Sequence, residues 1–457
     1  MSEDGAEQRY VKEAFDTNWV VPLGPNVNGF EKELEDFMTP SPALPDSLSP
    51  DPSPKGKGES ASKRVVALSS GTAAVHLGLL CAGVKPGDEV IVQSFTFCAS
   101  THPVTYLGAK PVLVDSEPDT WNIDPELMEE AIKDRIAKTG KKPAAIVPVA
   151  LYGMPYKADR IMEIANKYGI PVVEDAAEGF GSRYKGQVLG TFGKYGVLSF
   201  NGNKMITTSG GGALITEDED HWREVMMYAT QYRESYPYYQ HEKIGYNYRM
   251  SNICAGIGRG QMTVVEDHLK HHKHVQKMYE ELLKDVPGIK VHSQPDEWSM
   301  VHGQRSMVYD SNYWLCTITI DPSVRVKGQE NAYKTIVTGA VGGAAGVIHA
   351  AESAHTDCEP NANVEAMRVA LDKAQIEARP VWKPMHKQPC YLQGNVTIEK
   401  CKNENISCVT SDSSIAYVNG VSEALFKVGM CLPAGPYVTD DDVRYIVDTI
   451  KAAIERA

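Results

Sequence analysis

Lys204 is the residue whose surroundings point most directly to chemistry. It follows the apolar run Val197–Phe200 after a few small polar residues, and Gly210–Gly212 separate it from a second apolar run at 213–216. An amine on a loop between two buried strands is partly desolvated, which favours the neutral form that a Schiff-base lysine needs. A surface lysine in a glycine-rich turn would show the same local pattern. Other segments therefore have to decide between these two interpretations.

Asp175 stands at the exit of the apolar segment Ile170–Val173. A carboxylate at the end of a buried strand costs free energy unless it meets a cation. A protonated pyridine nitrogen would be a suitable partner. An aspartate that caps a helix would fit the same position, so this segment alone leaves both interpretations open.

Two further segments could bind parts of a flat, phosphorylated ligand. Ser69–Ala74 turns an apolar strand into a helix, and the free N–H groups and dipole of such a helix start bind phosphate well. A plain helix cap is the alternative. Phe97 follows another apolar strand and could present its face to a ring, although a core aromatic is equally compatible with the pattern.

Composition restricts the class of protein. The chain has 457 residues, is 42% hydrophobic and 23% charged, and therefore suits a globular protein of two or three domains. Its net charge of −13 argues against nucleic acid or an anionic membrane as a partner. The polar N-terminus, the lack of a long apolar run, and nine cysteines without a CxxC pair favour a cytoplasmic location.

From residue 65 onward, short apolar runs alternate with segments of helical period. Strands are expected at 65–68, 89–92, 111–114, 144–149 and 171–174, and helices at 71–81, 125–138 and 157–168. This alternation predicts an α/β fold with a mostly parallel sheet flanked by helices on both faces. Ligands of such a sheet bind at the carboxyl ends of its strands.

Together these segments resemble the DegT/StrS-type nucleotide-sugar aminotransferases, which are pyridoxal 5′-phosphate (PLP) enzymes of fold type I. The matching segments are Asn18–Gly29, Ser69–Ala74, Pro86–Ile91, Ser94–Phe97, Glu174–Ala177, Ser199–Lys204, Gly245–Arg249, Arg379–His386 and Cys431–Pro433. The resemblance implies an aspartate-aminotransferase-like fold and a homodimer with shared active sites.

The resemblance also implies a role for each matching residue. Lys204 would bond covalently to PLP, and Asp175 would keep the pyridine nitrogen protonated. Phe97 would cover the ring, and Glu178 would lie beside the ring hydroxyl, as in a subset of the family that acts on bacillosamine-type sugars. The phosphate would be bound by Gly71, Thr72 and Ser199 and, across the dimer interface, by Asn247. Residues that match the sugar-nucleotide pocket are Asn18, Trp19, Arg249, Arg379, Trp382, Lys383 and His386.

The implied reaction transfers an amino group from L-glutamate to a keto-sugar nucleotide and leaves 2-oxoglutarate. We expect the acceptor to be a UDP-linked 4-keto-6-deoxy-N-acetylhexosamine aminated at C-4. A C-3 keto sugar and a non-catalytic PLP-binding regulatory homologue are the alternatives. A dehydratase of the same family would carry histidine in place of Lys204.

We expect two domains with three insertions. Residues 1–285 should form an N-terminal arm and the large PLP-binding domain, and residues 286–457 a smaller α+β domain. The segment 39–63 is rich in Pro, Ser, Lys and Gly and is expected to be disordered. Further insertions relative to the family lie at about 323–361 and 392–414.

Four histidines lie close together on a predicted long helix: His268, His271, His272 and His274. His268 and His272 have the spacing of a shared metal site. No acidic or thiol partner stands at a matching spacing, so we expect a solvated basic face and no metal.

Overall fold

The computed structural model describes residues 1–39, 63–301, 304–332, 358–401 and 403–455. The expected disordered insertion therefore falls, over 40–62, outside the described residues. Most of the second insertion, 333–357, also lies outside them. No helix within the described ranges combines the length and the apolar character that crossing a membrane requires.

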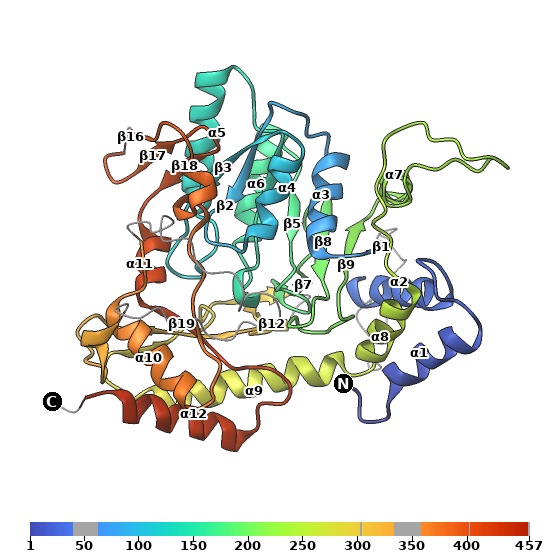
Figure 1. Cartoon of the computed structure of the whole chain (residues 1–457). Helices are drawn as coiled ribbons and strands as arrows, with labels where there is room; N and C mark the ends of the chain where they lie inside the picture. Colours follow the sequence, from blue (N-terminus) through green and yellow to red (C-terminus); the bar gives the residue numbers. More distant parts are fainter. Residues whose placement is uncertain (40–62, 302–303, 333–357, 402, 456–457) are drawn as a thin grey trace, which may run out of the picture.

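One long sheet forms the centre of the larger part of the molecule (Figure 1). Isolated bridges between residues 146 and 172 and between 149 and 175 join two ladders into a single strand order, β1-β9-β8-β5-β4-β2-β3-β18-β17-β16. Strands β8, β5, β4, β2, β3 and β18 run parallel, and β9 is antiparallel to both of its neighbours. The predicted mostly parallel sheet is thus confirmed.

The strand bounds are β1 (Arg64–Leu68), β2 (Glu89–Gln93), β3 (Lys110–Val114), β4 (Ala145–Val147), β5 (Val173–Asp175), β8 (Tyr195–Ser199), β9 (Gly212–Thr216), β16 (Thr397–Lys400), β17 (Ser407–Thr410) and β18 (Ile415–Val418). A small separate sheet joins β6 (Arg183–Tyr184), β7 (Gln187–Val188) and β13 (Tyr309–Asp310).

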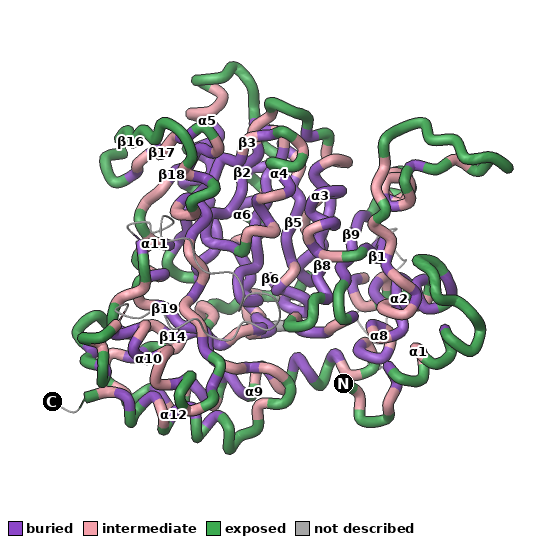
Figure 2. The backbone as a smooth tube through the Cα atoms, viewed as in Figure 1, coloured by how far each residue is buried: buried purple, intermediate pink, exposed green. Residues whose placement is uncertain are grey.

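Helices cover both faces of the long sheet because alternate strand residues enter two different cores. In β2, Ile91 belongs to one core, whereas Val90 and Val92 belong to the other. The first core includes residues of α2 (Pro25–Met38), α5 (Pro125–Thr139) and α6 (Ala158–Tyr168). The second includes residues of α3 (Gly71–Cys81), α4 (His102–Tyr106) and α7 (Glu219–Ala229). Two-sided burial explains why these strands are continuous apolar runs (Figure 2).

A second part of the chain has its own core. The sheet β10-β14-β19-β15 packs with α9 (Val265–Leu283), α10 (Ala362–Lys373) and α12 (Asp440–Ala453). Its strands are β10 (Ile289–Val291), β14 (Cys316–Ile320), β15 (Arg379–Pro380) and β19 (Gly429–Leu432), and a hairpin of β11 (Trp298–Val301) and β12 (Gln304–Met307) stands apart. This α+β arrangement is compatible with the expected small domain, and the boundary at residue 285 stays a prediction.

The third insertion, at about 392–414, leads into the long sheet. It contains β16 and β17, which pair in order with β18 directly after it, and β18 pairs in parallel with β3. The following helix α11 (Val421–Val428) is anchored there by Asp115, whose carboxylate accepts hydrogen bonds from the backbone N–H groups of Gly420 (2.9 Å) and Ser422 (3.1 Å). This segment therefore adds strands to the large sheet and not to the sheet of the small domain.

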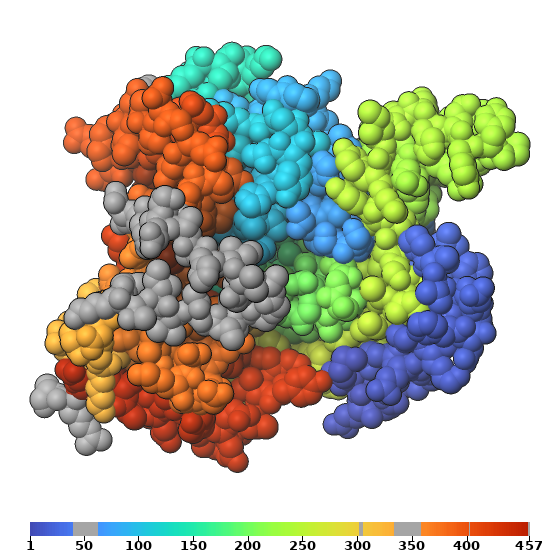
Figure 3. All heavy atoms as spheres, viewed as in Figure 1, coloured from blue at the N-terminus to red at the C-terminus, as the bar shows by residue number. Residues whose placement is uncertain are grey.

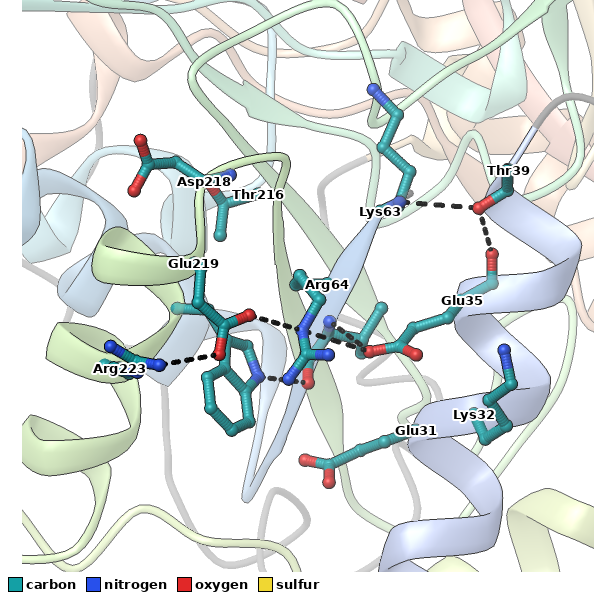
Figure 4. Close-up of polar contacts among 12 residues, drawn as sticks. Glu31, Lys32, Glu35, Thr39, Lys63, Arg64, Thr216, Asp218, Glu219 and Arg223 are labelled. Carbon is teal, nitrogen blue, oxygen red and sulfur yellow. Dashed lines mark hydrogen bonds and ion pairs between the residues drawn. The ribbon is translucent and has the colours of Figure 1, made fainter. Parts of the chain in front are cut away.

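A surface charge cluster, defined here as Glu35, Arg64, Glu219 and Arg223, ties α2, β1 and α7 together (Figure 4). Arg64 lies between Glu35 (3.8 Å) and Glu219 (3.3 Å). At the edge of this cluster, the Lys63 N–H donates to Thr39 Oγ1, so the last described residue before position 40 is bonded to the first after position 62.

The N-terminal helices α1 (Ala6–Asp16) and α2 pack on α8 (Asn252–Met262), beside the start of β1. The contact of α1 with α8 is close because glycines of α8 leave room for it. A Cβ at Gly260 would lie 2.4 Å from the backbone nitrogen of Glu7.

Candidate active site

A cavity of about 370 Å³ lies at the carboxyl ends of β5 and β8 and at the start of α3. This is the edge at which an open parallel sheet binds its ligands. The cavity brings together eight of the residues singled out in the sequence: Gly71, Thr72, Phe97, Asp175, Glu178, Ser199, Lys204 and Trp382.

Lys204 is largely enclosed in the cavity and is not an exposed turn residue, since only 11% of its side chain is accessible. Its Nζ lies 3.2 Å from Glu178 Oε1 and 3.9 Å from the centroid of the Trp314 ring. The other carboxylate oxygen of Glu178 accepts a hydrogen bond from the Tyr152 N–H (2.8 Å). Burial raises the pKa of Glu178, and the charge of Lys204 opposes that rise.

Asp175 is fully enclosed at the end of β5. Its carboxylate accepts hydrogen bonds from Ser100 Oγ (2.7 Å) and from the Ala177 N–H (3.1 Å), and Ser100 Oγ is itself 2.8 Å from Thr96 Oγ1. No helix begins after this strand, which removes the helix-cap interpretation. Burial raises the pKa of Asp175, while these hydrogen bonds and the charge of Lys204 lower it. Within the described ranges no cation reaches ion-pair distance, so a cationic ring nitrogen would complete the site.

The start of α3, where Ser69–Ala74 are expected to bind a phosphate, opens into the cavity. Ser70 caps the helix, its Oγ accepting from the Ala73 N–H (3.0 Å), and Gly71 and Thr72 line the cavity. A Cβ at Gly71 would lie 2.8 Å from the Cβ of Ser199. Only glycine therefore lets the helix start approach Ser199 this closely.

The mouth of the cavity is aromatic. Phe97 is 52% exposed and meets Trp382 edge to face, with ring centroids 4.8 Å apart. Phe97 is therefore not a core residue. A helix start for a phosphate, a buried carboxylate for a cationic nitrogen, an amine for an aldehyde and an aromatic side chain at the mouth together fit PLP.

The remaining predicted substrate residues do not line this cavity in the single chain. Arg249 is buried and bonded to Glu31 and to the Ala67 carbonyl oxygen (3.0 Å). His386 is buried between Ser94 Oγ (2.7 Å) and Glu423 Oε1 (3.2 Å). The others outside the cavity are Asn18, Trp19, Arg379 and Lys383. Asn247, which is predicted to bind the cofactor phosphate of the partner subunit, also lies outside the cavity of its own chain.

The place of Arg249 and His386 in the sugar-nucleotide pocket stays a prediction, although their polar atoms already have protein partners in the single chain. Those of His386 hold the 385–386 turn against the end of β2, since the Met385 N–H also donates to the Ser94 carbonyl oxygen (2.8 Å). Ion pairing with His386 and Lys387 holds the pKa of Glu423 at about 2.

The expected solvated face of histidines is wrong for His268 and His272, which are both buried. His268 Nδ1 lies 3.2 Å from the Met205 carbonyl oxygen, and His272 Nδ1 lies 3.0 Å from that of Tyr313. The two histidines thus attach α9 to the loops beside Lys204. Among the described residues no group of side chains has the arrangement of a metal site.

Three residues of the site were missed by the sequence analysis: Ser100, Tyr152 and Trp314. Each directly contacts a predicted residue that is distant in the chain. Ser100 contacts Asp175, Tyr152 contacts Glu178, and Trp314 contacts Lys204. No motif surrounds Trp314; a tryptophan directly before an apolar strand was the only signal.

Comparison with known proteins agrees with the class of protein that the sequence suggested. Residues 60–329 match the model of the DegT/DnrJ/EryC1/StrS aminotransferase family. The chain is 38% identical to the GDP-perosamine synthase of Caulobacter vibrioides over 453 residues, which span 99% of this chain and 95% of that protein. It is 34% identical to the UDP-2-acetamido-2-deoxy-3-oxo-D-glucuronate aminotransferase of Pseudomonas aeruginosa over 265 residues, 58% of this chain and 65% of that protein.

A crystal structure of a DegT DnrJ EryC1 StrS aminotransferase from Brucella abortus superimposes with a TM-score of 0.73 at 23% identity, covering 98% of this chain and 95% of that chain. This likeness extends the agreement to the fold of both parts of the molecule.

Proposed function

Because the chain belongs to the DegT/DnrJ/EryC1/StrS aminotransferase family, whose members are PLP-dependent sugar aminotransferases of fold type I, we propose that it aminates C-4 of a nucleotide-linked 4-keto-6-deoxy sugar. L-Glutamate is the proposed donor, and a UDP-linked N-acetylhexosamine is the proposed acceptor. The observation that carries the proposal is the cavity in which Lys204, Asp175 and Glu178 meet the start of α3.

PLP, when bound, accepts the amino group and withdraws electrons from the carbon that loses its proton. In this chain Asp175 would hold the proton on the ring nitrogen, since a buried carboxylate favours a cationic partner. Ser199, Thr72 and the N–H groups at the start of α3 would hold the phosphate. Phe97 would cover the ring and restrict access of water.

Lys204 would act both as the anchor of the cofactor and as the base that moves the proton. Glu178, at 3.2 Å, would hold the lysine ammonium after the proton is taken up.

The acceptor is the least constrained part of the proposal. Glu178 supports the UDP-linked N-acetyl sugar through its resemblance to enzymes of bacillosamine-type sugars. The name of the Caulobacter relative instead specifies a GDP-linked product, and that of the Pseudomonas relative a 3-oxo sugar. A GDP-linked 4-keto sugar and a UDP-linked 3-keto sugar are therefore the competing acceptors.

We also propose that two copies complete each other's sites. Asn247 and the arm residues Asn18 and Trp19 lie outside the cavity of their own chain. The segment 231–246 projects from the body (Figure 3) and carries Tyr239 and Ile244, which are 76% and 89% exposed. Apolar side chains this exposed are typical of an interface.

A half-reaction assay tests the proposed activity. The purified protein should show the visible absorbance of bound PLP, and L-glutamate should remove it. Adding each of the three acceptors should then restore it, fastest with the UDP-4-keto-N-acetyl sugar, and NMR of the product identifies the aminated carbon. Absorbance that no amino donor changes would refute transamination, whereas faster recovery with a competing acceptor would replace only the proposed sugar.

A further inference from the structure

Trp314 is a buried aromatic residue that touches the reactive end of Lys204. The lysine Nζ lies 3.9 Å from the ring centroid, and Trp314 is 3% exposed. An ammonium over an indole face is attracted by the ring quadrupole, and the attraction grows where water is excluded.

Hydrogen bonds fix Trp314 to the chain segments that carry Lys204 and Glu178. Its Nε1–H donates to the carbonyl oxygen of Asn203, the residue before Lys204 (2.7 Å). Its backbone N–H donates to Asn312 Oδ1 (2.8 Å), and Asn312 Nδ2 donates to the carbonyl oxygen of Glu178 (2.9 Å). One short loop therefore connects the lysine loop with the residue that pairs with the lysine.

These contacts give the lysine amine a single place when it is free. The indole face covers one side, and Glu178 Oε1 stands 3.2 Å away on another. The other carboxylate facing this space is Asp175, which also lines the cavity. A side chain held in this way samples few rotamers, so its nitrogen stays at a constant position relative to the bound ligand.

We propose that Trp314 is a positioning residue for Lys204: together with Glu178 it holds the ammonium in the place to which the amine returns whenever it is not bonded to the cofactor. The inference rests on the proposed role of Lys204 and adds a second partner to it. Trp382, 6.3 Å from Trp314 between ring centroids, lines the cavity but has no such contact with the amine.

The test measures the reactivity of Lys204 itself. Full-length protein, first stripped of cofactor and then loaded with pyridoxamine phosphate, is treated with an amine-reactive reagent, and labelling of Lys204 is followed by peptide mass spectrometry. Trp314→Leu removes the ring face, and Trp314→Phe keeps a weaker one. Trp222→Phe is the matched control, because Arg64 lies 4.3 Å from the Trp222 ring and Nε1–H donates to the Val65 carbonyl oxygen.

At pH 7 we expect Trp314→Leu to label about tenfold faster than the parent protein, which corresponds to about 1.4 kcal/mol lost from the ammonium form. Trp314→Phe should show a smaller increase, and Trp222→Phe none.

Equal labelling of Lys204 in Trp314→Leu and in the parent protein overturns the proposal. An increase that is as large in Trp314→Phe as in Trp314→Leu also overturns it, since that result would report exposure of the lysine alone. If Trp314→Leu does not fold, the Phe variant decides by the first criterion. The labelling experiment needs no turnover by the loaded protein. A failed half-reaction assay together with the expected labelling pattern would therefore refute the proposed function and leave the role of Trp314 standing.

Discussion

The cavity and the surface charge cluster hold the same kinds of side chain in opposite circumstances. Around Arg64 each carboxylate is paired with an arginine. The outer pair reaches solvent, since 47% of the Glu219 side chain and 65% of that of Arg223 are accessible, whereas Glu35 is 17% accessible. In the cavity, Lys204 is the one cationic side chain among the described lining residues. It faces two enclosed carboxylates, Asp175 and Glu178, and only Glu178 lies within ion-pair distance of it.

The difference separates scaffold from function. Exposed ion pairs are screened by water and contribute little to the free energy of folding. The surface charge cluster therefore mainly links α2, β1 and α7. Buried carboxylates with too few cations cost folding free energy. Their uncompensated negative charge remains available to attract a cationic group of a ligand. Neutralising a charge should therefore affect activity in the cavity and almost nothing in the cluster.

The sharpest way to break this comparison is Asp175→Asn, which keeps the shape and removes the charge. We expect the glutamate half-reaction to slow by about 10²–10³-fold, the usual loss when one preorganised electrostatic group is removed. Unfolding by urea should be no easier than in the parent protein, because an incompletely paired buried charge has gone.

Glu219→Gln is the matched change in the surface cluster and should leave the half-reaction rate unchanged. Equal rates for Asp175→Asn and the parent protein would contradict the role of the carboxylate.

Arg249→Met tests a buried pair outside the cavity. The side chains of Arg249 and Glu31 are 9% and 12% accessible, so the variant leaves Glu31 buried without its cation. We expect a loss of about 3 kcal/mol in the free energy of unfolding, measured with urea.

In Arg223→Met the change should stay within about 0.5 kcal/mol. An Arg249 variant of unchanged stability but weakened acceptor binding would support the substrate-binding role that the sequence suggested.

The histidines of α9 extend the contrast to pH. Burial lowers the pKa of His272 from 6.5 to about 4, whereas His274 is exposed beside Asp440. Between about pH 6.5 and about pH 4, His272 is protonated in the unfolded chain but neutral in the folded protein. Its contribution to stability is therefore complete above about pH 6.5 and is lost as the pH falls.

At about 1.4 kcal/mol per pKa unit, the loss attributable to His272 is about 3 kcal/mol by pH 4. His272→Asn should flatten this part of the stability profile, and His274→Gln should not. A profile with the same slope in both variants would assign the acid sensitivity to other groups.

Ser100→Ala probes the support of the cavity carboxylate and should have the smallest effect. It removes the 2.7 Å hydrogen bond to Asp175 and should weaken PLP binding about tenfold, measured by equilibrium dialysis, since a hydrogen bond to a charged group contributes about 1.5–3 kcal/mol.

Ser323→Ala is the matched control, because Ser323 Oγ donates to the exposed Asp321 (2.6 Å). Its PLP affinity should equal that of the parent protein. An unchanged affinity in Ser100→Ala would mean that the Ala177 N–H alone holds Asp175 in place.

The sequence alone determined the elements and the reactive groups. Periodicity is local, so the strands around β2 and β5 and the helix α3 could be recognised from apolar runs of a few residues. Lys204 and Asp175 stand at strand ends, and parallel strands bring such ends to one edge of the sheet. Their meeting in one cavity therefore followed from patterns within short segments.

The tertiary structure decided which partners the polar side chains have. Arg249 pairs with Glu31, 218 positions away, and Trp314 donates to Asn203, 111 positions away. Likewise β18 contains an ordinary apolar run, but only the open edge beside β3 makes it a strand of the large sheet. The chemical type of a side chain can be read directly from the sequence. Its hydrogen-bond or ion-pair partner depends on how distant elements pack, and no local pattern in a single sequence reports that packing.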